Sequence, residues 1–501
     1  MPLLSFARLS ERSELQCESP AQPEQVAFRR LLRDTFDQYV FNEIPERLIY
    51  IPKMKMIARW QTRILLWPHM EAFTERDLFA VMNKHSETMR TREQGLRQLI
   101  KERSKYAMLS HRWFDDGDEP TFQNFSFRKT RSLSGYKKLV RFCKKARNDY
   151  GCDLAWADTC CIDKTSSSEL DEAIRSMFRW YSNSYVCIAY LGDSSTASDF
   201  EDEVWFMRGW TLQELLAPTL LKFYGKGWLP ISNSFNDKQD ASVISVISRV
   251  TTIPEDDLVA YIPGPQRVRE KMMWAARRRT TRVEDIAYSL IGVFDLGMAI
   301  AYGEGDRAFY RLMVEIVESC HEWDIFLFEG EVSPFHFALP QAPQSYHELP
   351  SSWTQWNKTH PRGNKWFTLT KRGMQFRLLV IDIDPVPHTT DEKIVYSIAV
   401  NATIKHPDIF DHALALVGLK VSELDPDTFR YAIGIVDFER GAHEGEGQLL
   451  WDRDYFCFLV RRRAGYELWE VVETVGPTVV HCKQDLLGQP IASVVATDVR
   501  W

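Results

Sequence analysis

The strongest constraint on this chain is an alternation of short apolar runs and amphipathic helix patterns in its N-terminal half. The apolar runs are Tyr106–Leu109, Leu154–Ala157 and Val186–Leu191, each of a length typical of a buried strand. Two helix patterns separate them, Tyr136–Tyr150 and Glu169–Tyr181. Strands joined through helices form right-handed crossovers, which build a parallel sheet. The sequence therefore predicts an α/β core.

The regions before and after this core have other patterns. Residues 1–100 are expected to be mostly helical, with one strand at Arg47–Ile51 and a long helix from Glu75 to Lys105. Residues 101–325 are expected to combine the α/β core with helical additions, of which Arg282–Phe294 and Asp306–Ser319 are the clearest.

The C-terminal part, residues 330–501, changes to short alternating runs punctuated by Gly, Pro and Asp. This pattern is typical of antiparallel sheets. We expect a separate β-rich domain, sandwich-like or barrel-like.

Composition narrows the possible partners and compartments. The formal net charge is -7, so no overall basic field attracts nucleic acid. No run reaches the ~20 apolar residues that span a bilayer, and the N-terminus lacks an export signal pattern. The nine cysteines include no C-x-x-C pair, which argues against a structural metal site and for a reducing compartment. We therefore expect a cytoplasmic protein with no membrane span, no nucleic-acid partner and no metal or other cofactor.

Polar residues follow the predicted strands, at the sheet edge where parallel sheets bind ligands. The first strand is followed by Ser110, His111, Arg112 and Trp113. The second strand ends at Asp158, and a loop then passes through Asp163 and Lys164. Ser166 and Glu169 have the spacing of a capping box at the start of the next helix.

A fourth segment, Arg208–Pro218, carries Trp210 and Glu214 four residues apart. This spacing puts both side chains on one face of a short helix. A carboxylate one turn from an indole can occupy a partly apolar pocket. The alternative from spacing alone is that Trp210 is a core residue and Glu214 a surface carboxylate.

Three segments together resemble the fungal heterokaryon-incompatibility (HET) family. They are Tyr106–Trp113, Ala155–Lys164 and Arg208–Pro218, which occur in the family's order and span residues 104–220. A further stretch, Trp274–Gly305, resembles longer HET proteins. The resemblance implies an effector of non-self recognition and programmed cell death, a form of innate immunity.

HET domains in turn look like distant relatives of Toll/interleukin-1 receptor (TIR) domains. That resemblance implies a flavodoxin-like parallel sheet with helical additions. It also maps the glutamate that cleaves NAD in enzymatic TIR domains onto Glu214, through the Trp-x-x-x-Glu-Leu pattern of Trp210–Leu215. Trp210 and the residues after the first strand would then shape the pocket for NAD, which is a candidate substrate and not a bound cofactor. Asp158 would orient this pocket, or alternatively cap its own loop.

The chemistry of NAD makes one carboxylate sufficient. Nicotinamide is already a cationic leaving group and needs no general acid, whereas an ordinary glycosidase needs two carboxylates. Glu214 could hold the ribose hydroxyls and stabilise an oxocarbenium-like transition state.

Two functional hypotheses follow from the resemblance. In the first, the protein hydrolyses NAD at the nicotinamide-ribose bond once it forms a homo-oligomer that orders the Asp163–Ser168 loop, which carries Lys164 and is followed by Glu169. In the second, it is a non-enzymatic signalling adaptor whose residues 330–501 bind a protein partner or ligand. In either case, residues 1–100 and 330–501 could act as structural supports or inhibitory covers.

Overall fold

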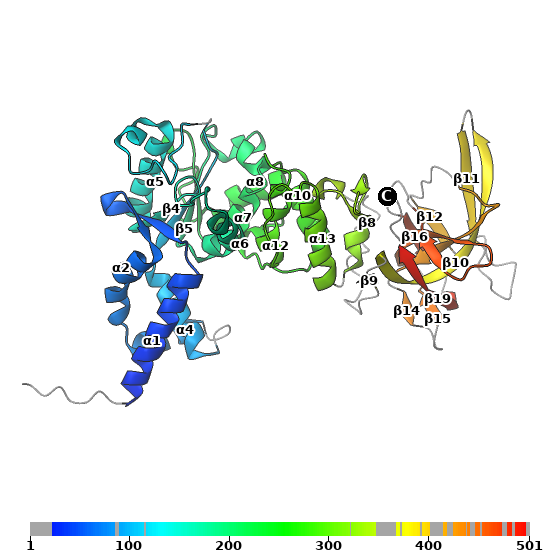
Figure 1. Ribbon diagram of the computed structural model, residues 1–501, viewed down its shortest axis with the longest axis horizontal. Coiled ribbons are helices and arrows are strands. Elements are labelled where there is room, and N and C mark those ends of the chain that lie inside the picture. The colour runs from blue at the N-terminus through cyan, green and yellow to red at the C-terminus, as the bar shows by residue number, and fades with distance from the viewer. Residues whose placement is uncertain are drawn as a thin grey trace, which may run out of the picture. The chain divides into compact units, whose positions relative to one another are not determined.

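The structure is a computed structural model of the chain (Figure 1). It describes residues 23–85, 90–114, 117–320, 322–346, 367–370, 373–390, 393–400, 414–417, 424–436, 438–440, 446–450, 453–472, 478–482 and 486–496. Predictions for other residues, such as the start of the N-terminal segment and the last residues of the chain, lie outside the described part. The chain separates into two compact units, Met1–Leu48 with Met56–Lys105, and Ile49–Lys55 with Tyr106–Trp501. The predicted three-domain division stays a prediction.

A six-stranded sheet forms the α/β core, in the order β2-β1-β4-β3-β5-β6. The predicted strands appear as β3 (Tyr106–His111), β4 (Leu154–Trp156) and β5 (Val186–Tyr190), and they are parallel as expected. β6 (Leu221–Tyr224) extends the parallel set, although the sequence did not reveal it. Ile49 and Tyr50 of β1 (Arg47–Tyr50) pair antiparallel with β4, so the sheet is mixed and not purely parallel.

Two long helices cover this sheet and confirm the amphipathic patterns. α5 (Ser134–Tyr150) and α6 (Ser167–Asn183) lie on either side of β4 and β5 (Figure 1). α6 packs through Trp180 and Tyr181, whose rings contact Trp156 edge-on. Only half of the predicted capping box forms. The Ser166 hydroxyl accepts a hydrogen bond from the Glu169 amide, as expected, but the Glu169 carboxylate accepts from the Asp163 amide.

The N-terminal unit is mainly helical, as predicted. The single long helix expected from Glu75 to Lys105 is wrong, because two helices cover this stretch. The capping residue Thr91 accepts from the Gln94 amide and starts a new helix there. The elements are α1 (Pro23–Asn42), β2 (Lys55–Ala58), α2 (Arg59–Glu71), α3 (Glu75–Lys84) and α4 (Arg92–Arg103).

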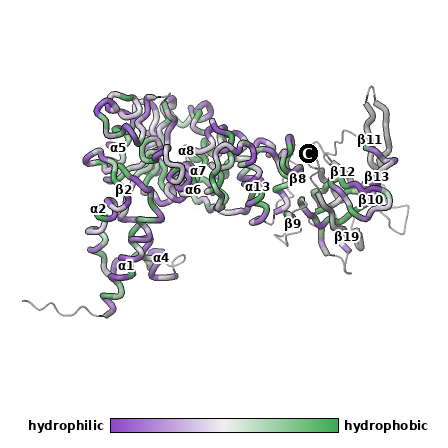
Figure 2. Tube along the Cα trace, viewed as in Figure 1, coloured by the Kyte–Doolittle hydropathy of each residue, from purple (hydrophilic) through white to green (hydrophobic). Residues whose placement is uncertain are grey.

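A helical extension follows β6, and hydrophobic and hydrophilic segments alternate along its helices (Figure 2). The single helix expected over Arg282–Phe294 is instead two short helices, which Ser289 and Leu290 separate. The last predicted helix is confirmed. α7 (Thr211–Leu216) precedes β6. The helices of the extension are α8 (Ala241–Thr251), α9 (Glu255–Val259), α10 (Val268–Ala276), α11 (Asp285–Tyr288), α12 (Ile291–Phe294) and α13 (Arg307–Ser319).

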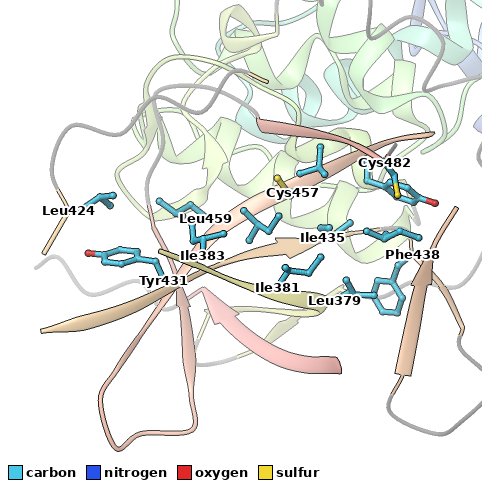
Figure 3. Packing of buried hydrophobic residues seen from close by; sticks show 14 residues of the cluster. Leu379, Ile381, Ile383, Leu424, Tyr431, Ile435, Phe438, Cys457, Leu459 and Cys482 are labelled. Carbon is cyan, nitrogen blue, oxygen red and sulfur yellow. The ribbon is translucent and has the colours of Figure 1, made fainter. Parts of the chain in front are cut away.

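The C-terminal region is β-rich, as predicted, and its large sheet curls into a half-barrel. β10 pairs with β13 along one stretch and with β19 along another, which bends the sheet back on itself. Side chains from β10, β13 and β16 meet in an apolar core (Figure 3). The elements are β7 (Val332–Ser333), β8 (His336–Pro340), β9 (Phe367–Thr370), β10 (Gly373–Thr390), β11 (Lys393–Val400), β12 (Leu414–Val417), β13 (Phe429–Ile435), β14 (Glu439–Arg440), β15 (Glu446–Leu449), β16 (Arg453–Arg463), β17 (Trp469–Val471), β18 (Thr478–Cys482) and β19 (Leu486–Ala496).

The helices of the described residues are all too short or too polar to cross a lipid bilayer.

Candidate active site

A buried hydrogen-bonded chain lies at the carboxyl end of β3. Ser110 is fully buried, and its hydroxyl donates to the carboxyl group of Glu214 on α7. The indole nitrogen of Trp205 donates to the same hydroxyl over 2.8 Å. Glu214 itself is only 9% exposed, so the surface-carboxylate alternative is wrong.

The surroundings of Glu214 favour its neutral form. Burial raises the pKa of Glu214 to about 7, the Ser110 hydroxyl opposes this shift, and the Asp158 carboxylate adds to it. Arg208 and the Tyr181 hydroxyl also lower the pKa. The carboxyl group therefore titrates near neutral pH, as general acids and bases in active sites often do.

His111 does not lie in a loop, because β3 continues through it and buries its side chain. Neither ring nitrogen has a hydrogen-bond partner among the described residues, and Nε2 is 3.7 Å from the Glu119 carboxylate. Burial, with the nearby charge of Lys138, holds the pKa of His111 well below its usual range. Lys138 instead carries the charge here and bonds to Glu119 over 2.5 Å.

The exposed residues after β3 connect the strand ends to one another. Arg112 forms an ion pair with Asp193, which follows β5, over 3.6 Å. The indole nitrogen of Trp113 donates to Asp158, which follows β4, over 2.9 Å. β3 lies between β4 and β5, so these contacts bridge the point where the chain reverses its order across the sheet. Crevices at such points are the usual ligand sites of open α/β sheets.

The loop after β4 is held against this edge. Asp163 accepts from the side chain of Gln123 over 2.7 Å and from the amide of Thr165 over 3.0 Å. Glu169 bonds the Asp163 amide over 2.8 Å, which ties the loop to the start of α6. Lys164 extends from the loop over the Trp113 ring, with its nitrogen 3.7 Å from the ring centroid.

Five of the ten predicted site residues thus form one connected group. Ser110, Glu214, Asp158, Trp113 and Lys164 are linked by bonds, ring contacts or charge. Trp210 is not among them; its side chain lies near Asp285 on α11 and partly offsets the effect of burial, which raises the pKa of that carboxyl. The described residues include no group of three or more His, Cys, Asp and Glu side chains able to hold a metal ion.

Residues 106–201 match the sequence model of the family described as Heterokaryon incompatibility protein (HET). This stretch of the chain is therefore similar to that family. It is also 40% identical over 223 residues to the Vegetative incompatibility protein HET-E-1 of Podospora anserina, a match that covers 42% of this chain and 16% of that protein. No solved structure shows significant similarity to the chain.

Glu214 lies beyond the residues that match the HET model, and segments further along the chain hold its helix in place. The buried guanidinium of Arg278 donates to the Thr211 hydroxyl over 2.9 Å and to the Arg208 carbonyl over 3.0 Å. Burial lowers the pKa of Arg278 to about 9, and Glu214 opposes the shift. Arg278 was not among the predicted site residues, although it lies in a run of three arginines, Arg277–Arg279.

Gly209 shows how closely the extension approaches this helix. Its amide donates to the Arg279 carbonyl over 2.9 Å, and the Arg279 amide donates to Met207 over 2.7 Å. A Cβ atom at Gly209 would overlap the methyl group of Thr280. The candidate active site therefore depends on residues 207–285 as well as on residues 106–201, which match the HET model.

Proposed function

We propose that this protein is an effector of heterokaryon incompatibility that triggers programmed cell death by hydrolysing NAD. The HET domain and the similarity to a vegetative incompatibility protein support the biological role. That similarity covers a small part of the relative, so the proposal concerns only what this HET domain does.

A TIR-like, flavodoxin-like core is part of this proposal. Numbered along the chain, the four parallel strands have the spatial order 2-1-3-4, from β4 through β3 and β5 to β6. Doubly wound sheets of the flavodoxin type share this order and bind ligands beside the first strand. The buried Ser110 and Glu214 lie beside that strand.

The observation that carries the enzymatic proposal is the buried Glu214 carboxyl with a pKa of about 7 at the end of β3. In the reaction, the bond between C1′ of the ribose and N1 of nicotinamide breaks, and its electron pair goes to N1. Water adds to C1′ and releases a proton, which gives ADP-ribose and neutral nicotinamide. Ionised Glu214 would hold the ribose hydroxyls and stabilise positive charge on the ring.

Substrate access requires a change in this resting arrangement, because Glu214 is nearly enclosed and its carboxyl is bonded to Ser110. We infer that self-assembly supplies the change by moving the loop that carries Asp163 and Lys164. A homo-oligomer would then be the active form. If self-assembly opens the site, turnover per molecule should rise with protein concentration. A site that is always open would not show this dependence.

The test is nicotinamide release from NAD by the full chain, measured over a range of protein concentrations. We expect turnover to rise more steeply than concentration and Glu214→Gln to reduce it by about a thousandfold or more. Glu203→Gln is the matched control, since Glu203 is also buried and accepts from a serine hydroxyl, Ser194, over 2.7 Å. Unchanged turnover in Glu214→Gln would refute the assignment.

A second candidate function is supported by the same enclosure of Glu214. On this view the HET domain acts as an adaptor through contacts between copies, and the β-rich residues 330–501 bind a protein partner. Cell death that persists in a Glu214→Ala variant would favour the adaptor over the hydrolase.

A further inference from the structure

The ammonium of Lys164 lies on the indole face of Trp113, at the rim of the candidate active site. Its nitrogen is 3.7 Å from the ring centroid, well inside the ~6 Å range of cation–π attraction. The indole is held by its edge, because its nitrogen donates to Asp158 over 2.9 Å. Trp113 is nevertheless 41% exposed, so a ligand can reach the ring from solvent.

We propose that Trp113 is a subsite for a planar organic cation and that Lys164 occupies this subsite in the resting protein as an internal competitor. This inference rests on the proposed function, because the pyridinium ring of NAD is such a cation. The two cations cannot share the same indole face, since each needs the same space and they repel one another. Lys164 must therefore leave before the substrate ring stacks.

Asp158 connects this subsite to the Glu214 carboxyl. Burial lowers the pKa of Lys164, and the Asp158 carboxylate opposes that shift. Burial is the main reason why the pKa of Glu214 is raised, and the Asp158 carboxylate raises it further. Asp158 thus lies within electrostatic reach of both groups while it bonds the Trp113 edge. A cationic ring on Trp113 would therefore lie near the Asp158 carboxylate, which in turn acts on Glu214.

The loop that carries Lys164 is held by surface hydrogen bonds that water can replace. Asp163 accepts from Gln123 and Thr165, and all three side chains are near the surface. Hydrogen bonds of this kind between exposed groups contribute little net stability because water replaces them. Movement of Lys164 away from Trp113 therefore needs no disruption of the buried core.

Cleavage would reverse the exchange. When the C1′–N1 electron pair returns to the ring, nicotinamide becomes neutral and loses its cation–π attraction to Trp113. The Lys164 ammonium then regains the indole face. The subsite consequently prefers the charged substrate ring over the neutral product.

The experiment measures binding of 1-methylnicotinamide, a permanent pyridinium cation, to the full chain by calorimetry. Lys164→Gln should bind it roughly three- to thirtyfold more tightly than the wild type, and Trp113→Ala should lose this binding. Lys145→Gln is the matched control, because it removes an ammonium 4.9 Å from the Tyr224 ring at another place on the domain and should leave affinity unchanged. Neutral nicotinamide should show no gain in Lys164→Gln.

Two results would overturn the subsite. One is equal affinity of the wild type and Lys164→Gln. The other is a gain in affinity by Lys164→Gln that persists in the double variant with Trp113→Ala. The measurement needs no catalysis, so pyridinium binding without nicotinamide release refutes only NAD hydrolysis. Hydrolysis that depends on Glu214 without the Lys164 effect refutes only the subsite.

Discussion

The α/β region and the C-terminal β-rich region bury different kinds of side chain. At the end of β3, the α/β region buries Ser110, His111 and Glu214 next to one another. Among residues 367–482 whose burial is described, no polar or charged side chain is buried. Their core consists of aliphatic, aromatic and cysteine side chains between the strands (Figure 3).

This difference separates two uses of a protein interior. Burying a polar or ionisable group costs free energy unless its bonding is complete, so a core that serves stability alone avoids such groups. The β-rich region follows that rule. The α/β region departs from it at the sheet edge where ligands are expected, which is why we assign the chemistry to that edge.

The largest stability effect is expected in the apolar core. Ile435 on β13 is fully buried there, and Ile435→Ala should lower the free energy of unfolding of the β-rich region by about 2–5 kcal/mol. Urea unfolding measures the change. Tyr466→Ala is the control, because Tyr466 is 64% exposed and should change stability by less than ~0.5 kcal/mol. Equal effects of both variants would contradict the packing described for this core.

A substitution at Glu214 should raise the stability of the protein, whereas Ile435→Ala should lower it. Its pKa is raised from 4.5 to about 7 in the folded protein, so folding binds extra protons and the free energy of unfolding falls as pH rises between these values. Above pH 7 the wild type therefore carries a penalty of up to about 3 kcal/mol from this group. Glu214→Gln should relieve it and be more stable than the wild type at pH 8.

The pH dependence of that difference is the decisive measurement. At pH 4, where Glu214 is protonated in both the folded and unfolded chain, the stabilisation by Glu214→Gln should disappear. Thermal unfolding at the two pH values measures it. A difference that is the same at both pH values would show that Glu214 is not a strained carboxylate, and the contrast between the two regions would weaken.

A smaller effect tests whether the helical extension is part of the α/β core. Gly292 on α12 faces Phe178 on α6, and a Cβ atom at this glycine would overlap the Phe178 Cβ. Gly292→Ala should cost about 1–3 kcal/mol through overpacking. Gly297→Ala is the matched control, since nothing lies within 4 Å of a Cβ at that position. If both substitutions are tolerated equally, α12 does not pack on α6 as described.

The sequence by itself determined the local elements of the α/β core. β3, β4, β5, α5 and α6 were predicted within a few residues, because hydrophobic periodicity and capping are properties of neighbouring residues. The same local patterns gave a wrong prediction where two short helices follow one another along the chain. Glu75–Lys105 and Arg282–Phe294 each contain two helices, since a new cap or a turn interrupts a pattern that continues across it.

Only the tertiary structure decided how the site is assembled. Ser110 and Glu214 are 104 positions apart in the chain, and Arg278 reaches Thr211 across 67 positions. Trp210 was expected beside Glu214 from helical spacing, and its side chain also acts on the pKa of Asp285, which the spacing did not reveal. The curl of the β-rich sheet likewise depends on the pairing of β10 with both β13 and β19. The physical reason is the same in each case: burial and the pKa of a side chain depend on neighbours in space, and periodicity reports only neighbours along the chain.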